Sequence, residues 1–115
     1  MPVKISNEDE AVEGSSYTIE TTFTDEDDAE LTPNTFNWSE TDEEGTVING
    51  HSAETETPSS TVAVTLKGDD LAMQTGESEY GYRVYTVWGT YNSTYGTDLP
   101  YQESCRFRVR NLIAK

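Results

Sequence analysis

An aromatic segment, GYRVYTVWGTY at residues 81–91, stands out in an otherwise acidic and polar chain of 115 residues. In an extended strand, successive side chains point to opposite faces of the sheet. One face would carry Tyr82, Val84, Thr86 and Trp88, and the other Arg83, Tyr85, Val87 and Tyr91. Neither set is polar, whereas a strand covered on one side only alternates apolar and polar residues. The segment therefore predicts a strand with both faces covered.

Shorter segments of alternating polarity flank this strand. Strands are predicted at residues 16–24, 35–41, 61–67 and 103–112, with turn formers in residues 25–34 and 92–100. Gly45 is placed to take a positive φ in a hairpin across residues 42–50. Asp69 or Asp70 could cap one helical turn, and no longer helix is expected.

About seven short strands separated by turns predict an all-β fold, an antiparallel β-sandwich. A closed barrel is an alternative that the strand spacing leaves open. We expect a single domain over residues 1–115, with residues 1–15 weakly ordered or forming an edge strand. The inward positions predict one shared core: Ile19, Phe23, Phe36, Trp38, Val62, Val64, Leu66 and Phe107.

Charge is distributed unevenly along the chain. The formal net charge is −15, and Lys4 is the only basic side chain in residues 1–60. This balance argues against nucleic acid or an anionic membrane surface as a partner. No apolar run is long enough for membrane insertion, and no signal peptide is expected at the start. A solvating acidic surface or adaptation to high salt would also explain the composition.

Catalytic chemistry is not expected from this composition. The chain has one histidine, His51, in a predicted turn, and one cysteine, Cys105, in the inward register of the last strand. We interpret them as a surface imidazole and an inert buried thiol rather than a catalytic dyad. A blue-copper site would need a second histidine, and no phosphate-binding loop is present. The sequence thus predicts no enzyme and no cofactor.

Calcium is the main alternative ligand. Asp25, Asp27 and Asp28 are weak calcium candidates, because they concentrate oxygen ligands in one turn. Residues 41–44 could join them only if the two loops meet at one end of the fold. Neither segment has the spacing of an EF-hand loop. We therefore favour a solvated turn over a metal site.

The strongest functional hint in the sequence is a set of arginine and aromatic residues that suit a protein interface. Arg106, Arg108 and Arg110 should project from one face of the last strand as a ladder, which Arg83 could join. The ladder could pair with a neighbouring protein, or in cis with Glu20, Glu40 or Glu103. The aromatic residues assigned to the interface are Trp88, Tyr91, Tyr95 and Tyr101. We expect another chain to cover the second face of residues 81–91.

Several segments resemble immunoglobulin-like domains. The stretch TFTDEDDAELTPNTFNWSETDEEGTVING (22–50) is similar to the B-to-C′ region of such domains in phage virion and bacterial surface proteins. Trp38 matches their core tryptophan, GDDLA (68–72) their crossover between sheets, and CRFRVRN (105–111) their last strand. The paired cysteines of antibody domains are missing, which removes an antibody-type interpretation.

The resemblance implies an immunoglobulin-like sandwich with a structural or interaction role. The most specific expectation is a phage virion accessory subunit, either a capsid decoration protein or a head–tail component. Its partners would be other virion subunits or copies of itself, and its location the virion. The alternative is a microbial cell-surface adhesion module that binds carbohydrate or calcium.

Overall fold

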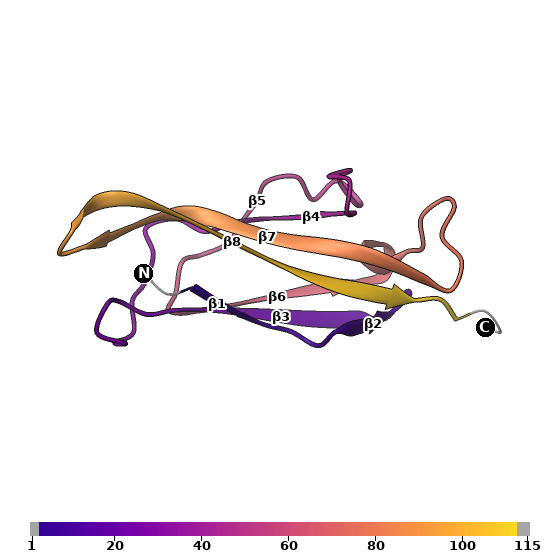
Figure 1. The fold of residues 1–115 in the computed structure, drawn as a ribbon, viewed down its shortest axis with the longest axis horizontal. Helices are drawn as coiled ribbons and strands as arrows, with labels where there is room; N and C mark the ends of the chain where they lie inside the picture. The colour runs from indigo at the N-terminus through magenta and orange to yellow at the C-terminus, as the bar shows by residue number, and fades with distance from the viewer. Residues whose placement is uncertain (1–2, 113–115) are drawn as a thin grey trace.

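The alternating segments form two β-sheets that pack face to face in the computed structural model, which describes residues 3–112 (Figure 1). The three-stranded sheet has the order β1 (Val3–Ser6), β3 (Ser16–Phe23), β6 (Thr61–Lys67). The five-stranded sheet has the order β2 (Glu10–Val12), β8 (Gly96–Arg110), β7 (Tyr80–Ser93), β4 (Asn37–Thr41), β5 (Glu54–Thr55). The chain is an all-β sandwich, as predicted, and the alternative of one closed barrel is wrong.

The first residues contribute an edge strand to each sheet. β1 pairs antiparallel with β3, whereas β2 pairs parallel with β8, in the register Glu10↔Arg108. The expectation of an edge strand in residues 1–15 is confirmed for residues 3–6 and 10–12; residues 1–2 lie outside the described part of the chain. Because residues 3–12 cross from one sheet to the other, they link the two layers.

The β7–β8 hairpin is the longest feature of the molecule. Its strands pair from Tyr80↔Arg110 to Ser93↔Gly96, with an irregularity between Tyr91 and Ser93. The far end of the hairpin projects beyond the sandwich (Figure 1), and the principal extents of the molecule are 53 × 22 × 20 Å. The loop predicted at residues 92–100 is therefore mostly strand. Pairing with β7 outweighs the turn propensity of these residues, and Pro100 is tolerated because β8 is an edge strand there.

The predicted core is confirmed. All eight expected residues are buried, and Ile19 and Leu66 have no exposed surface. Cys105 is half-buried and packs against this core, while Phe107 and Val109 lie within it. The aromatic rings meet across the sheets, with Tyr17 and Phe107 centroids 4.6 Å apart. Hydrophobic burial in one layer between the sheets thus holds the sandwich together.

The two faces of β7 differ in burial. Arg83, Tyr85 and Val87 face the core and have no exposed surface. On the other face, Tyr82 remains 39% exposed, and Val84, Thr86 and Trp88 are half-buried. Both faces are covered, but the outer one only in part.

The turns follow local sequence preferences. Gly45 has the expected positive φ, at 89°, in a turn where Val47 makes a single bridge to Thr41. One helical turn, the 3-10 helix η1 (Gly68–Leu71), follows β6. Asp70 lies inside this turn, and its Oδ2 accepts a hydrogen bond from the Lys67 N–H at 3.0 Å. No helix in residues 3–112 is long and apolar enough to cross a membrane.

Replacing Trp38 with alanine should lower the free energy of unfolding by about 3–5 kcal/mol, because a buried ring is lost and a cavity is left. Trp38 is 4% exposed and its ring centroid lies 5.7 Å from that of Tyr85. Trp88→Ala, which removes the other tryptophan from the half-buried outer face, is the control and should cost much less. Denaturant unfolding measures both. Equal losses of stability would contradict the difference in burial between the Trp38 and Trp88 rings.

Candidate functional site

The predicted arginine ladder is present on the outer face of β8. Arg106, Arg108 and Arg110 alternate with the inward residues Phe107 and Val109. The guanidinium carbon of Arg106 lies 4.8 Å from the Tyr82 ring centroid, and that of Arg108 lies 4.6 Å from the Tyr80 ring centroid. These are cation–π distances. The long arginine side chains therefore shield part of the aromatic face of β7.

The ladder is also paired in cis. Glu10 accepts from Arg108 and Arg110, each at 3.0 Å, and Glu43 accepts from Arg106 at 2.9 Å. The expected partners Glu20, Glu40 and Glu103 are not the ones used. Glu10 reaches the ladder because β2 lies parallel beside β8, a long-range pairing that no local pattern in the sequence signals.

Arg83 does not belong to the ladder, so its assignment to the outer interface is wrong. It shares the inward face of β7 with Tyr85, and its side chain is 0% exposed. Both terminal nitrogens donate to the Glu77 carboxylate at 2.7 Å, and they also bond the carbonyls of Tyr82 and Ala72. A Cβ at Gly81 would overlap the Glu77 carboxylate. Glycine at this position thus makes room for a buried ion pair.

The predicted aromatic group is divided by the structure. Tyr101 is 6% exposed and its hydroxyl donates to the Thr35 carbonyl at 2.7 Å, so its assignment to an exposed interface is wrong. Gly89 lies opposite Tyr101 and leaves space for that hydroxyl. Trp88 and Tyr91 are half-buried. Tyr95, near the tip of the hairpin, is 77% exposed.

The acidic turns are organised by their own backbone. Asp25 Oδ1 accepts from the N–H groups of Asp27 and Ala29 at 2.8 and 3.0 Å, and Asp28 has a positive φ of 63°. Asp42 caps its turn in the same way. The first turn precedes β4 and the second follows it, so the two loops lie at opposite ends of that strand. The geometry of Asp25 is that of a turn-forming aspartate.

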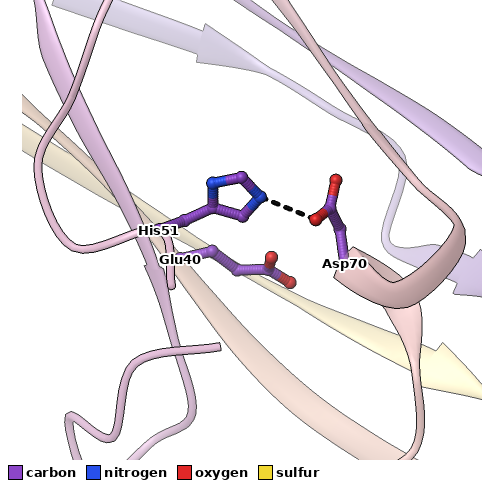
Figure 2. A group of neighbouring side chains, drawn as sticks. All are labelled: Glu40, His51 and Asp70. Atoms are coloured by element: carbon purple, nitrogen blue, oxygen red, sulfur yellow. Dashed lines mark hydrogen bonds and ion pairs between the residues drawn. The ribbon is translucent and has the colours of Figure 1, made fainter. Parts of the chain in front are cut away.

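An internal polar cluster was missed by the sequence analysis. Glu40, His51 and Asp70 come from β4, the loop before β5, and η1, and their side chains converge between the sheets (Figure 2). His51 Nε2 lies 2.6 Å from Asp70 Oδ1. One ligand-type atom from each residue lies within 4.8 Å of the other two. Carboxylates and an imidazole in this arrangement could hold a metal ion or a proton.

His51 is held in place by its loop, which folds back on β4. The Glu40 N–H donates to the His51 carbonyl at 3.0 Å, and the Ile48 N–H donates to the Glu40 carbonyl at 2.9 Å. The imidazole packs 4.7 Å from the Trp38 ring, and its side chain is 21% exposed. The imidazole is therefore half-buried, where a surface imidazole was expected.

Glu40 is the unusual member of the cluster. It has no exposed surface, and neither carboxylate oxygen has a hydrogen-bond partner. Burial, and then the nearby Asp70, raise the pKa of Glu40 to about 8, while Arg83 opposes the shift. Burial also acts to raise the pKa of Asp70, but hydrogen bonds from Asn49, Lys67 and His51 outweigh it and lower that pKa. Two neighbouring carboxyl groups thus favour different protonation states.

A Cys–His nucleophile finds no support in this geometry. Burial raises the pKa of Cys105 to about 11, so the thiolate form is scarce at neutral pH. The Nε2 of His51 is already hydrogen-bonded to Asp70.

Parity along the strands was the signal that could have located the buried charges. Glu40 has the same parity as Phe36 and Trp38, and Arg83 has the same parity as Tyr85 and Val87.

No family model, curated protein or solved structure gives a significant match to the chain. The functional argument therefore rests on the residues themselves.

Glu77→Gln should cost about 3–5 kcal/mol of stability, because it leaves the buried Arg83 guanidinium without a counter-charge. The Glu77 pKa is lowered because hydrogen bonds from Arg83 and Gln74 outweigh the effect of burial. The ion pair therefore stabilises the fold above the ordinary pKa of glutamate, and that contribution is lost as the pH falls through the lowered value. Wild-type protein should lose stability on acidification by an increment that Glu77→Gln lacks. Parallel pH profiles would contradict this role.

Replacing Glu40 with glutamine should change the pH dependence of stability in the direction opposite to that of Glu77→Gln. With a pKa raised from 4.5 to about 8, the folded carboxyl stays protonated while the unfolded one ionises, so wild type is progressively penalised across that interval. The stability of Glu40→Gln relative to wild type should rise from pH 4.5 to pH 8 by a few kcal/mol, since each pKa unit is worth about 1.4 kcal/mol. Urea unfolding with a chelator present measures the difference. A difference that does not change with pH would contradict the raised pKa.

Proposed function

We propose that this chain is a non-catalytic interaction subunit of a protein assembly, and most specifically an immunoglobulin-like accessory subunit of a phage virion. A capsid decoration or head–tail position fits this role. The single observation that carries the proposal is the outer face of the β7–β8 hairpin, where arginine and tyrosine side chains are stacked and left open to solvent.

The strand order supports the immunoglobulin-like part of the proposal. The order β1-β3-β6 corresponds to strands A, B and E, and β8-β7-β4-β5 to strands G, F, C and C′. Trp38 on β4 is buried, as is the tryptophan on strand C of antibody domains. The parallel pairing of β2 with β8 places the start of the chain beside the last strand.

The outer face has the composition of an interaction surface. Tyrosine and arginine are enriched at protein interfaces, and here Tyr80 and Tyr82 are 38% and 39% exposed beneath the arginines. A hollow of about 260 Å³ is lined by Asp9, Tyr82, Arg106, Phe107 and Arg108. The projecting hairpin extends this face to Tyr95 at its tip. A partner could therefore contact both the stacked face and the hairpin end.

Charge favours an acidic protein surface as the partner. Within residues 3–112, the three guanidinium groups of the ladder pair with two carboxylates in cis, from Glu10 and Glu43. The Arg106–Glu43 pair is exposed, with side-chain exposures of 62% and 48%, so it can exchange partners at little cost. Copies of this chain carry abundant carboxylates in residues 1–60. Another copy or an acidic virion subunit would complement the ladder.

The adhesion alternative has weaker support. Sugar binding would need open aromatic faces, whereas Arg108 and Arg106 each cover one face of the Tyr80 and Tyr82 rings. Tyr95, near the hairpin tip, is the more open ring at 77% exposure. Two backbone N–H groups already occupy Asp25 Oδ1, so calcium there would be limited to the other carboxylate oxygen of Asp25.

A double charge reversal, Arg106→Glu with Arg108→Glu, should reduce assembly at least tenfold while the protein still folds cooperatively, because exposed ion pairs contribute at most about 1 kcal/mol each. Lys4→Glu with Lys67→Glu is the matched control, since it changes the net charge equally on the exposed side of the three-stranded sheet. Sedimentation velocity measures self-association of each variant across protein concentration.

The same variants can be assayed for binding to capsid or tail proteins encoded by neighbouring genes. Equal assembly of the reversal and the control would contradict an interface on this face. A gene neighbourhood without virion genes would contradict the virion role and leave the interface to be judged by the variants.

A further inference from the structure

The cluster of Glu40, His51 and Asp70 has a donor set that suits a metal ion. It combines one imidazole nitrogen with two carboxylates, and all three ligand atoms lie within 4.8 Å of one another. Calcium and magnesium prefer oxygen ligands alone, and calcium takes six to eight of them. Zinc and its neighbours in the first transition row accept mixed nitrogen and oxygen ligands.

An independent observation points to a missing ligand. Both Glu40 oxygens are buried and have no hydrogen-bond partner, although buried carboxylates in proteins are normally satisfied. The Glu40 side chain runs beside His51 toward Asp70 (Figure 2). A cation among these three residues would give the Glu40 carboxylate the partner that no protein atom supplies.

The surroundings resemble the support that metal ligands usually have. Metal-bound histidines commonly direct the second ring nitrogen to a carboxylate. Glu54 Oε1 is the carboxylate oxygen near His51 Nδ1, at 3.7 Å, which is beyond hydrogen-bond distance and leaves that nitrogen without a partner. Asp70 is fixed by the Asn49 side-chain amide at 2.7 Å and by the Lys67 N–H at 3.0 Å. The Trp38 ring limits rotation of the imidazole. Two of the three ligands are therefore oriented before any ion arrives.

The geometry needs only a small adjustment. Ligand atoms bound to zinc at about 2.0–2.2 Å stand roughly 3.4 Å apart in a tetrahedral site. The 2.6 Å contact between His51 and Asp70 must therefore open slightly, and Glu40 must move inward. The ion would replace the proton that His51 and Asp70 share, and that proton, with any proton on Glu40, would leave to solvent.

We propose that Glu40, His51 and Asp70 bind one divalent transition-metal ion, with zinc as the ion to test, and that this ion fastens the two sheets together. Glu40 belongs to the five-stranded sheet, and Asp70 follows directly on β6 of the three-stranded sheet. A metal ion bound to both would cross-link the two sheets through coordination bonds. The chain has one cysteine, so an internal disulfide cannot serve that role. The burial of the site fits a structural ion. This inference is independent of the proposed assembly role.

Calorimetric titration of the chelator-treated full chain with zinc chloride should give one site per chain, with heat that depends on the buffer because protons are released. Zinc should raise the melting temperature, whereas calcium and magnesium at the same concentration should not. Because His51 is the only histidine, its imidazole nitrogen resonances report binding directly. They should shift from a protonated Nε2 to a metal-bound Nε2 with a protonated Nδ1.

Variants distinguish this site from the many surface carboxylates. Glu40→Gln and His51→Ala should each weaken zinc binding at least tenfold, because each removes one of the three proposed ligands. Glu43→Gln removes an exposed carboxylate outside the cluster and should bind zinc as wild type does. Unchanged imidazole resonances in wild type, or zinc binding that survives both Glu40→Gln and His51→Ala, would overturn the proposal. The resonance measurement needs no variant, so it decides the matter even if a substitution prevents folding.

Discussion

A guanidinium group without access to solvent must be paired, and much of this structure follows from meeting that requirement at Arg83. Its position on β7 places it beside Tyr85 and Val87 in the core, where an unpaired charge would cost several kcal/mol. Glu77 supplies two carboxylate oxygens to the terminal nitrogens, which also donate to the carbonyls of Tyr82 and Ala72, and Gly81 leaves the space for the carboxylate. The segment that precedes β7 must therefore fold back over the strand, which opposes a shift of one residue in its register. Such a shift would also move every core side chain of β7 to the outer face.

Fixing β7 in this register determines the outer surface as well. With Arg83 inward, the tyrosines at positions 80 and 82 point outward, and the antiparallel partner β8 brings its arginines beside them. The acidic first half of the chain then contributes Glu10 and Glu43 to the edges of this array. The fold thus brings acidic residues from the first half of the chain into contact with the arginines of the last strand. The remaining acidic groups stay in exposed turns, where solvent and backbone amides satisfy them.

Local periodicity predicted the core well, because the buried residues of β3 and β6 follow the alternation of their own strands. In β4, Trp38 follows it too, but Ser39 is buried as well and breaks the alternation. Local periodicity predicted the charged contacts poorly. Glu10 reaches Arg108 through a parallel pairing across 98 positions of sequence, and His51, in an irregular loop, reaches Asp70 in the 3-10 helix η1. No local alternation pattern in the sequence signals either contact. Strand parity alone predicts that Arg83 and Glu40 point inward. The usual exposure of charged residues argues against burying them.

Several directional polar contacts, some buried and some exposed, connect segments that hydrophobic packing alone would leave free to slide. The Arg83–Glu77 pair ties the segment before β7 to the sheet, the Tyr101 hydroxyl holds residue 35 beneath the hairpin, and Asn34 donates to both Asn92 and Asp98 near the hairpin tip. Hydrophobic contacts are non-directional, so they stabilise a sandwich without fixing its register. Directional bonds at these points are what orient the projecting hairpin. Within residues 3–112, single atoms of Thr21, Arg83 and Tyr85 are also buried without a hydrogen-bond partner. Glu40 differs from them because both oxygens of a fully buried carboxyl group lack one. Ionised Glu40 is therefore the interior side chain that gains most from an added cation.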